Sequence, residues 1–421
     1  MTSWIASSAA WLTTRRLRAQ AMVLALCLWS VCALDLATPG MFDRAGNIKF
    51  QDFLPFYISA RMVAQGSVGK LYDQQFAVRQ MESILRQPAQ VRLPYLFGPQ
   101  VALLFAPLTA LTFPLAAGIF AALSLVIFFL CIGLMWKSCP HLREYVSLVV
   151  LSSAAYPPLF HTFIRGQISV LLLACFTSAW LAFSAGRPLL AGLALGLLAC
   201  KPQFLVAIPV ILLLAGAWRA LAGTILSAAA QLGLTWIIFG SAVMRAYFST
   251  LWHISSYMHA VEPGMASIQM HSLRSFWALL IPWPNLSMAL YVFTSILVVI
   301  LAAAAWKSSL NMAVRFSALT LAAVLVNPHL FVYDLLVLAP ALLLLADWIL
   351  SRSLAEEHPV FVDRLRLLTY LAFVLPLLGP LSRWTHLQLS VLAFVALLWI
   401  LWRYSAQAAS PQLAPGQPSV V

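Results

Sequence analysis

The chain has 421 residues, of which 62% are hydrophobic and only 9% are charged, and its mean hydropathy is +0.92. Soluble domains carry about a quarter charged residues, so this composition cannot cover a water-exposed surface and excludes a soluble globular protein. The formal net charge of +13 comes from single Lys and Arg residues between apolar runs, without the basic patch that nucleic acid requires. We therefore expect the membrane, and no nucleic acid, as a partner.

The first apolar run, at 19–37, follows Arg15, Arg16 and Arg18. Positive residues in short flanking segments stay on the cytoplasmic side of a membrane. The cluster therefore predicts a cytoplasmic N-terminus over 1–18. No small-residue cleavage site clearly follows the run, which favours an uncleaved membrane anchor over a removed signal peptide.

The polar stretch 38–100 is then predicted to be an external loop, the longest polar segment of the chain. Within it, 57–65 and 71–86 are expected to form short helices at the membrane interface. The next apolar stretch, 101–112, is too short to cross the bilayer and is predicted to be re-entrant or to lie along the membrane. With this assignment, nearly all later Lys and Arg residues in short loops fall on the cytoplasmic side.

Further apolar runs along the chain are compatible with membrane-spanning helices, because a crossing needs roughly 20 predominantly apolar residues and lipid satisfies no backbone polar group. Together with the first run, they predict about twelve transmembrane helices. The further helices are expected at 114–136, 145–160, 168–185, 188–200, 203–218, 220–239, 286–306, 312–327, 331–350, 366–381 and 386–403. We predict an all-α integral membrane protein with one polytopic domain over 19–403 and a disordered cytoplasmic tail over 404–421.

Asp52 lies among aromatic residues in the external loop, close to the predicted membrane surface. Apolar surroundings raise the pKa of a carboxylate and suit it to accept a proton from a hydroxyl group. The alternative is a plain helix N-cap or loop carboxylate.

Arg165, Gln167 and Lys201 are polar residues at the predicted ends of apolar helices, on the external side. Arg165 and Gln167, which end a predicted turn at 156–167, suit an anionic head group or sugar hydroxyls, although a snorkelling arginine is an equal alternative. Lys201 interrupts two apolar runs, and a lysine at the centre of a bilayer costs roughly 2.5–3.5 kcal/mol. It therefore needs an anionic partner or a route to water, and a lipid phosphate would fit.

His329, Tyr333 and Asp334 lie between two strongly apolar runs, and their spacing places them near one another at the start of the second helix. A histidine and a carboxylate there would orient a substrate or support a catalytic acid. A helix cap with an Asp–His hydrogen bond is the alternative.

The expected external loop 240–285 contains four further residues with metal-binding side chains, but their spacing fits no familiar metal motif. We interpret them as surface residues that line a substrate entrance, and we expect no metal site. These residues are His253, His259, Glu262 and His271. A Gly-rich phosphate loop and an Asp-x-Asp pair are also absent from the sequence, which argues against a nucleotide-linked donor.

Several of these elements occur in an order and spacing that resembles glycosyltransferase family 87, the polyprenol-phosphate-mannose-dependent mannosyltransferases and their relatives. The resemblance extends over about 50–340. It rests on Asp52-Phe-x-x-x-Tyr57, Gly166-Gln167, Lys201-Pro202, and Pro328-His329 with Tyr333-Asp334.

The resemblance implies a GT-C membrane fold and transfer of a sugar from a polyprenyl-phosphate carrier to a lipid or glycan acceptor. It implies Asp52 as the catalytic carboxylate. The donor phosphate and sugar are expected at Lys201, Arg165, Gln167, His329, Tyr57, Tyr333 and Asp334. Residues 327–334 depart from the Ser-Pro-x-Ser-Trp pattern of the mannosyltransferase branch, which leaves open whether the sugar is mannose or another hexose or pentose.

We accordingly expect an inverting, metal-independent glycosyltransferase of the inner membrane, with an external active site and no cofactor besides its lipid-linked donor. A transporter or flippase for lipid-linked sugars is the main alternative, because it would also need buried charges and lipid contact. It should, however, expose its site to both faces, whereas the distinctive polar residues fall on the external side alone. A non-catalytic scaffold is a third possibility.

Overall fold

The computed structural model describes residues 9–88, 95–253, 269–355 and 359–409. Within these ranges the chain is helical, without a strand, and two isolated β-bridges join Phe42 to Ile48 and Met270 to Phe331. This confirms the predicted all-α class.

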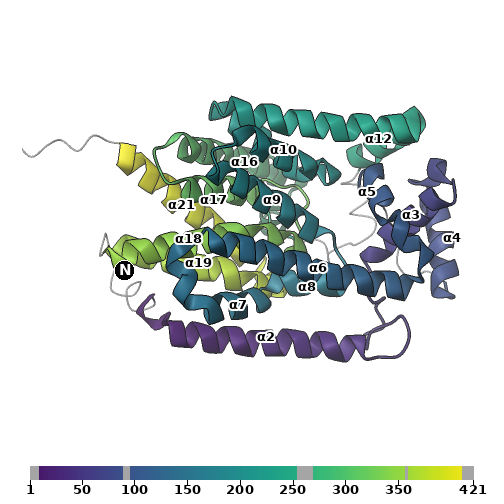
Figure 1. Ribbon diagram of the computed structural model, residues 1–421, viewed down its shortest axis with the longest axis horizontal. Helices are drawn as coiled ribbons and strands as arrows, with labels where there is room; N and C mark the ends of the chain where they lie inside the picture. Colours follow the sequence, from purple (N-terminus) through teal and green to yellow (C-terminus); the bar gives the residue numbers. More distant parts are fainter. Residues whose placement is uncertain (1–8, 89–94, 254–268, 356–358, 410–421) are drawn as a thin grey trace, which may run out of the picture.

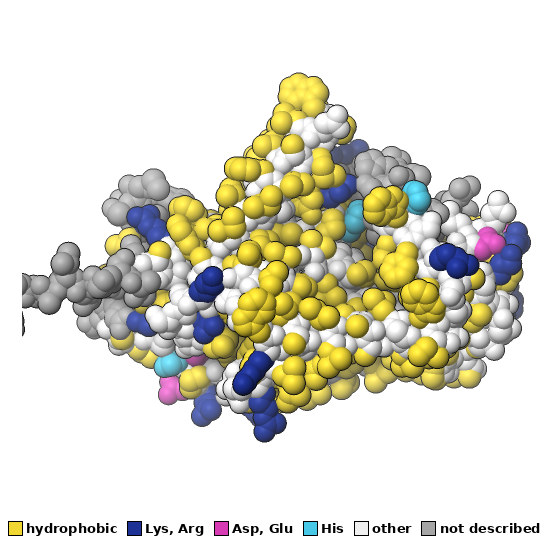
Figure 2. All heavy atoms as spheres, turned by 90° about the horizontal axis from the view of Figure 1, so that it is seen from above, with side chains coloured by type: hydrophobic (Ala, Val, Ile, Leu, Met, Phe, Trp, Pro, Cys, Tyr) yellow, Lys and Arg dark blue, Asp and Glu magenta, His cyan; other side chains and the backbone are white. Residues whose placement is uncertain are grey.

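The long helices run along the long axis of the molecule (Figure 1). One end carries the start of α2 (Thr14–Leu36) and the end of α21 (Leu389–Ala409), and we call it the terminal end. The opposite end carries α3 (Phe53–Ala64), α4 (Gln74–Leu85) and α5 (Pro99–Phe105), and we call it the α3 end. In a second view, hydrophobic side chains cover most of the middle of the face, while many Lys and Arg side chains lie toward its two ends (Figure 2).

Seven helices in the described part of the chain are long and apolar enough to cross a membrane, or up to eight if one bent pair counts as a span. They support a multi-pass membrane protein, but the predicted count of about twelve is not confirmed. The seven are Thr14–Leu36, Phe113–Lys137 (α6), Trp218–Trp252 (α12), Pro284–Lys307 (α16), Val332–Leu354 (η6 and α18), Pro359–Thr385 (α19, η7 and α20) and Leu389–Ala406.

The remaining apolar segments form helices of 10–17 residues, shorter than the roughly 20 that a straight crossing needs. Many of them start with a proline, which suits the first turn of a helix but ends the helix before it. They are Phe53–Ala64, Pro99–Ala110 (α5 and η2), Ser169–Ser184 (α9), Pro188–Cys200 (α10 and η4), Pro202–Leu214 (η5 and α11) and Met312–Leu325 (α17). The segment predicted as non-spanning, 101–112, is among them.

Three predicted segments have different limits. The helix expected at 145–160 is divided into α7 (Val146–Ala154) and α8 (Pro157–Arg165), which are bent by 45°. The turn expected at 156–167 is therefore mostly helix, because the proline at 157 starts a new helix instead of a loop. α12 continues past the expected end at 239 to Trp252, with a break at Gly240, whose φ is 77°.

The termini also differ from the prediction. α2 begins at Thr14, where the Thr13 side chain accepts a hydrogen bond from the Arg16 backbone, so the arginine cluster lies in its first turns. α21 continues to Ala409, so the tail predicted to start at 404 begins as helix. Of the expected loop 240–285, residues 254–268 with His259 and Glu262 lie outside the described residues.

The segment predicted to be an external loop is built around α3, which packs into the protein instead of lying on its surface. Eight of its twelve residues are buried. Phe53 and Phe56 pack against Phe105 of α5, with ring centroids 5.4 and 5.5 Å apart. α4, in contrast, is amphipathic and buries only Met81 and Leu85.

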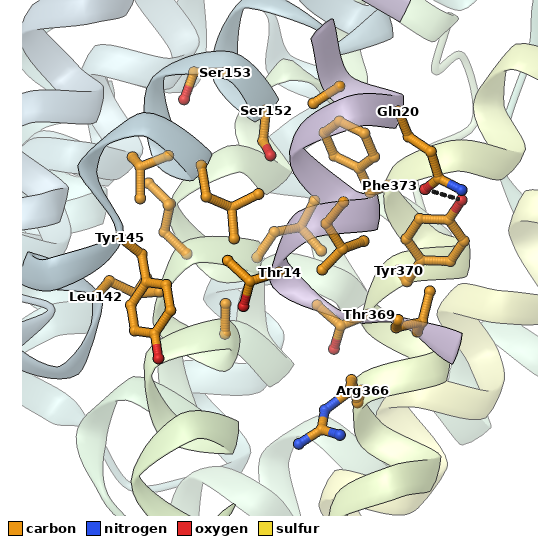
Figure 3. A pocket seen from close by; sticks show the side chains of 18 of the residues that line it. Thr14, Gln20, Leu142, Tyr145, Ser152, Ser153, Arg366, Thr369, Tyr370 and Phe373 are labelled. Carbon is orange, nitrogen blue, oxygen red and sulfur yellow. Dashed lines mark hydrogen bonds between the residues drawn. The ribbon is translucent and has the colours of Figure 1, made fainter. Parts of the chain in front are cut away.

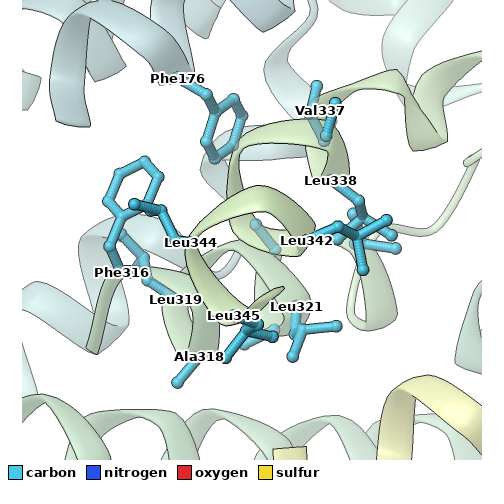
Figure 4. Packing of buried hydrophobic residues seen from close by; sticks show 14 of the residues in the cluster. Phe176, Phe316, Ala318, Leu319, Leu321, Val337, Leu338, Leu342, Leu344 and Leu345 are labelled. Atoms are coloured by element: carbon cyan, nitrogen blue, oxygen red, sulfur yellow. The ribbon is translucent and has the colours of Figure 1, made fainter. Parts of the chain in front are cut away.

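The centre of the bundle is a continuous apolar core in which α9, α17, η6 (Val332–Leu338) and α18 (Ala339–Leu354) interdigitate (Figure 4). Phe176 of α9 and Phe316 of α17 are fully buried, with ring centroids 6.4 Å apart. Every residue of η6 is buried. This segment carries Asp334 and is therefore held rigidly by the core around it.

α10 (Pro188–Gly196) and α12 approach each other closely through glycines. A Cβ at Gly192 would lie 2.0 Å from the Ala220 carbonyl oxygen, and one at Gly223 would lie 2.3 Å from the Leu189 carbonyl oxygen. Small residues allow such backbone contact between membrane helices, where packing drives association.

We expect Gly192→Ala to lower the free energy of unfolding by about 1–3 kcal/mol, because the backbone of α12 must move away from the added methyl group. The measurement is thermal unfolding of the detergent-purified protein. Gly133→Ala on α6 is the matched control, since a Cβ there meets no heavy atom within 4 Å. Equal melting temperatures for the two variants would contradict the close packing.

Candidate functional site

Asp52 immediately precedes α3, and its side chain is 15% exposed. Its Oδ2 accepts a hydrogen bond from Gln167 Nε2 at 3.0 Å, and its Oδ1 lies 3.6 Å from Arg165 Nη1. Asp52 occupies the N-cap position of α3, but its side chain makes no capping hydrogen bond to the helix. Its partners come from the end of α8, more than a hundred residues along the chain.

Gly166 makes this contact between α3 and α8 possible. It terminates α8 in the left-handed conformation, with φ of 71°, which favours glycine. A Cβ at this position would lie 2.7 Å from the Cβ of Phe53. The backbone N–H of Asp52 donates to the Arg165 carbonyl at 3.0 Å, so the two segments are joined directly.

Burial raises the pKa of Asp52, and the Arg165 charge and the Gln167 hydrogen bond partly oppose this rise. A carboxylate with a raised pKa binds a proton more tightly than an exposed aspartate does. Asp52 therefore combines the properties required of a general base, namely a fixed orientation and increased proton affinity.

Lys201 and Asp334 form a second pair, buried in the bundle. Lys201 is 4% exposed and Asp334 is fully buried, and their Nζ and Oδ1 atoms are 2.5 Å apart. Ser169 Oγ, at the start of α9, donates to the same oxygen at 2.8 Å, and the Phe331 backbone N–H donates to Oδ2 at 3.3 Å. A buried charge pair persists only when additional hydrogen bonds satisfy it, and here they are supplied.

The position of Lys201 follows from the break between η4 (Leu197–Cys200) and η5 (Pro202–Leu205), where its backbone is not helical, with φ of −135° and ψ of 77°. Its ammonium lies 5.6 Å from the ring centroid of Phe97 and 5.3 Å from that of Tyr333. Both aromatic faces stabilise the cation at these distances. An ammonium group has three N–H donors, so Asp334 does not exhaust its capacity to bind an anion.

The two pairs lie close enough to interact. The Lys201 charge lowers the pKa of Asp52 and the Asp334 charge raises it. The short segment 167–169 also connects the two pairs, because Gln167 contacts Asp52 and Ser169 contacts Asp334. Asp52 and Lys201, far apart in the sequence, thus belong to one site at the α3 end of the bundle.

Two other predicted site residues have structural contacts. The Tyr57 hydroxyl donates to the Leu111 carbonyl at 2.6 Å and anchors α3 to the segment after α5. His329 is 8% exposed, and its backbone N–H donates to the Asn327 side chain at 2.9 Å. Asp334, expected beside His329, instead uses its carboxylate for Lys201, Ser169 and the backbone.

Of the histidines expected at the loop surface, His253 is exposed but His271 is not. His271 is 1% exposed, its Nδ1 lies 2.7 Å from Ser390 Oγ, and its backbone donates to the Leu330 carbonyl at 2.9 Å. Burial lowers its pKa to about 3, so it stays neutral. The interpretation of His271 as a surface residue is therefore wrong, because a β-bridge to Phe331 draws its segment into the protein.

Sequence reasoning did not identify Ser169, Phe97 or the pairing of Lys201 with Asp334. The pairing had a signal in the sequence, because a lysine between apolar runs needs a buried acid and Asp334 lies in such a run. Ser169 and Phe97 had none. Among the residues that the structure describes, no three His, Cys, Asp or Glu side chains gather in a way that could hold a metal ion.

No curated protein and no solved structure matches the chain. A model of glycosyltransferase family 87 matches residues 95–332, which include Arg165, Gln167, Lys201 and His329 but not Asp52. Because the match covers more than half of the 421 residues, the chain belongs to glycosyltransferase family 87.

Proposed function

We propose that this membrane glycosyltransferase transfers a sugar from a polyprenyl-phosphate carrier to a hydroxyl group of a lipid or glycan acceptor, with Asp52 as general base. The observation that carries the proposal is the Asp52 carboxylate, held by Gln167 and Arg165 within electrostatic reach of the buried Lys201. A base and a cation close together match the two charges that develop in glycosyl transfer.

In the proposed reaction, Asp52 accepts the proton of the acceptor hydroxyl as its oxygen attacks the anomeric carbon of the sugar. The bond from that carbon to the phosphate oxygen breaks, and the polyprenyl phosphate leaves with the bonding electrons. A single displacement from the side opposite the phosphate inverts the anomeric configuration. The base must therefore lie on one side of the sugar and the cation on the other.

Lys201 is the proposed partner of the leaving phosphate, with Arg165 in a supporting role. Preorganised cations stabilise charge most effectively in a site from which water is excluded, and Lys201 is almost completely buried. These cations would take the electrostatic role without a metal ion. Gln167, Tyr333 and His329 are proposed to contact the donor sugar or phosphate, while Asp334 holds Lys201 in place.

A lipid-linked donor is supported by the position of the site. Asp52 directly precedes α3, and Lys201 contacts Phe97, which comes shortly before α5. Both pairs are therefore at the α3 end of the bundle of candidate membrane-spanning helices, where a membrane-embedded carrier would place its phosphate. The arginine cluster at the start of α2 lies at the opposite end. By the positive-inside rule, we propose an inner-membrane protein whose active site faces the external side.

We expect Asp52→Asn to lower the transfer rate about 10²–10⁴-fold, the usual contribution of a positioned general base. The amide preserves the shape and accepts the Gln167 hydrogen bond, so folding should be unaffected. The measurement is transfer from a panel of radiolabelled polyprenyl-phosphate sugars by purified protein in detergent.

Asp73→Asn is the matched control, since Asp73 caps α4 in the same external region and asparagine caps equally well. This control should keep wild-type activity. Activity of Asp52→Asn near that of the control would exclude Asp52 as the base.

For the second pair we expect Lys201→Met to abolish transfer and to destabilise the protein by roughly 3–5 kcal/mol, because it leaves the Asp334 carboxylate buried without a counter-charge. The double variant Lys201→Met, Asp334→Asn removes both charges. It should regain most of the lost melting temperature but none of the transfer activity. Recovered transfer in the double variant would mean that the pair has only a structural role.

The pH dependence gives a further test. Arg165 lowers the pKa of Asp52, so Arg165→Gln should raise it. Since the base works only when deprotonated, the acidic limb of the kcat/KM profile should move to higher pH in this variant. If the acidic limb stayed at the same pH or moved to lower pH in this variant, Asp52 would not be the group that titrates in the reaction.

A further inference from the structure

A second site of a different kind lies at the terminal end of the bundle. A half-open cavity of about 570 Å³ lies between α2, α7, α18 and α19 (Pro359–Val374). Its size lies within the roughly 300–1,000 Å³ of typical ligand sites. Three of the four enclosing helices belong to candidate membrane spans, and the fourth belongs to the bent pair.

The walls of the cavity are mainly apolar. α2 contributes one stripe of its surface, which contains Thr14, Leu17, Ala21 and Leu24 at helical spacing. Most of this helix is not buried, since Ala21 and Cys32 are its only two buried residues. It is fastened near the cavity by the Tyr370 hydroxyl, which donates to Gln20 Oε1 at 3.0 Å.

Polar groups lie at several places around the cavity. Figure 3 shows Thr14, Thr369 and Arg366 near one another in its lower half, whereas Ser152 and Gln20 lie in the upper half. Arg366 lies in the first turns of α19, near the start of α2 with its arginine cluster. Thr369 Oγ1, one turn further along the same face, is buried without a hydrogen-bond partner in the described structure.

From this arrangement we infer that the cavity is a binding site for an anionic phospholipid, with one acyl chain between α2 and α18 and the phosphate at Arg366 and Thr369. An apolar cavity does not hold water, whereas a lipid chain from the surrounding bilayer can fill it. Basic pockets between membrane helices recognise anionic head groups. Arg366 Nη1 lies 3.6 Å from Asp363, and its Nη2 donates to Ser353 Oγ at 3.1 Å, which leaves further N–H donors for a phosphate.

The occupant is a phospholipid of the nearer leaflet and not the sugar carrier. The cationic mouth lies at the terminal end, whereas the Asp52 and Lys201 pairs lie at the α3 end. A carrier bound at Arg366 would have its phosphate on the membrane face opposite Asp52. Tyr156 also lines the cavity, and its hydroxyl donates to the Leu335 carbonyl of η6 at 2.7 Å. The inference is independent of the proposed transfer reaction.

The test uses the full chain in phosphatidylcholine vesicles that contain a phosphatidylglycerol with a photoreactive acyl chain. Cross-linked peptides identified by mass spectrometry should come from the cavity-facing parts of α2 and α18. A phosphatidylcholine with the same photoreactive chain should label them much less. Equal labelling by both lipids, or labels only outside the cavity, would overturn the inference.

Different variants test the binding of the acyl chain and the binding of the lipid head group. Ala346→Trp fills the cavity and should abolish the labelling, and Arg366→Gln should reduce it about tenfold, as expected for a lost hydrogen bond to a charged group. Arg364→Gln removes an equal charge two residues away, outside the cavity lining, and should leave labelling unchanged. Equal losses in the two arginine variants would overturn recognition at Arg366. Displacement of the label by polyprenyl phosphate but not by unlabelled phosphatidylglycerol would also overturn the proposal.

Discussion

A lysine ammonium among membrane helices must have a counter-ion, and this requirement organises the site. Lys201 lies where two short helical segments break, and the buried Asp334 provides its charge partner. Asp334 in turn belongs to η6, which the apolar core surrounds on all sides. Removing two charges from water is costly, so the pair persists only because Ser169 and the Phe331 backbone complete its hydrogen bonds. The result is a cation whose position is fixed before any substrate arrives.

The position of Asp52 is linked to the Lys201–Asp334 pair. The segment 167–169 contacts both acids, through Gln167 and Ser169, so a movement of one pair affects the other. The left-handed turn at Gly166 sets the start of α9 against the start of α3. Burial then raises the proton affinity of Asp52, while Arg165 keeps the carboxylate ionisable. Such a site can hold a base and an anion-binding group apart, as displacement at a sugar carbon requires.

The class of the protein and several residues of the site could be predicted from the sequence. Composition alone excludes a soluble fold, and a charged residue in an apolar run, such as Lys201, is a functional candidate on energetic grounds. The number of spans could not be predicted, because hydropathy does not distinguish a crossing helix from a shorter buried one such as α17. Contacts between residues far apart in the sequence could not be predicted either. Nothing near His271 in the sequence indicates its bridge to the 330–331 segment, nor does the sequence near Tyr57 indicate its bond to Leu111.

The most direct test of the account is a structure of the protein with a non-hydrolysable polyprenyl-phosphonate sugar analogue. The account predicts that the phosphonate oxygens contact the Lys201 ammonium and that the anomeric carbon lies between the phosphonate and the Asp52 carboxylate. A phosphonate bound away from Lys201, or a sugar whose anomeric carbon faces away from Asp52, would contradict it.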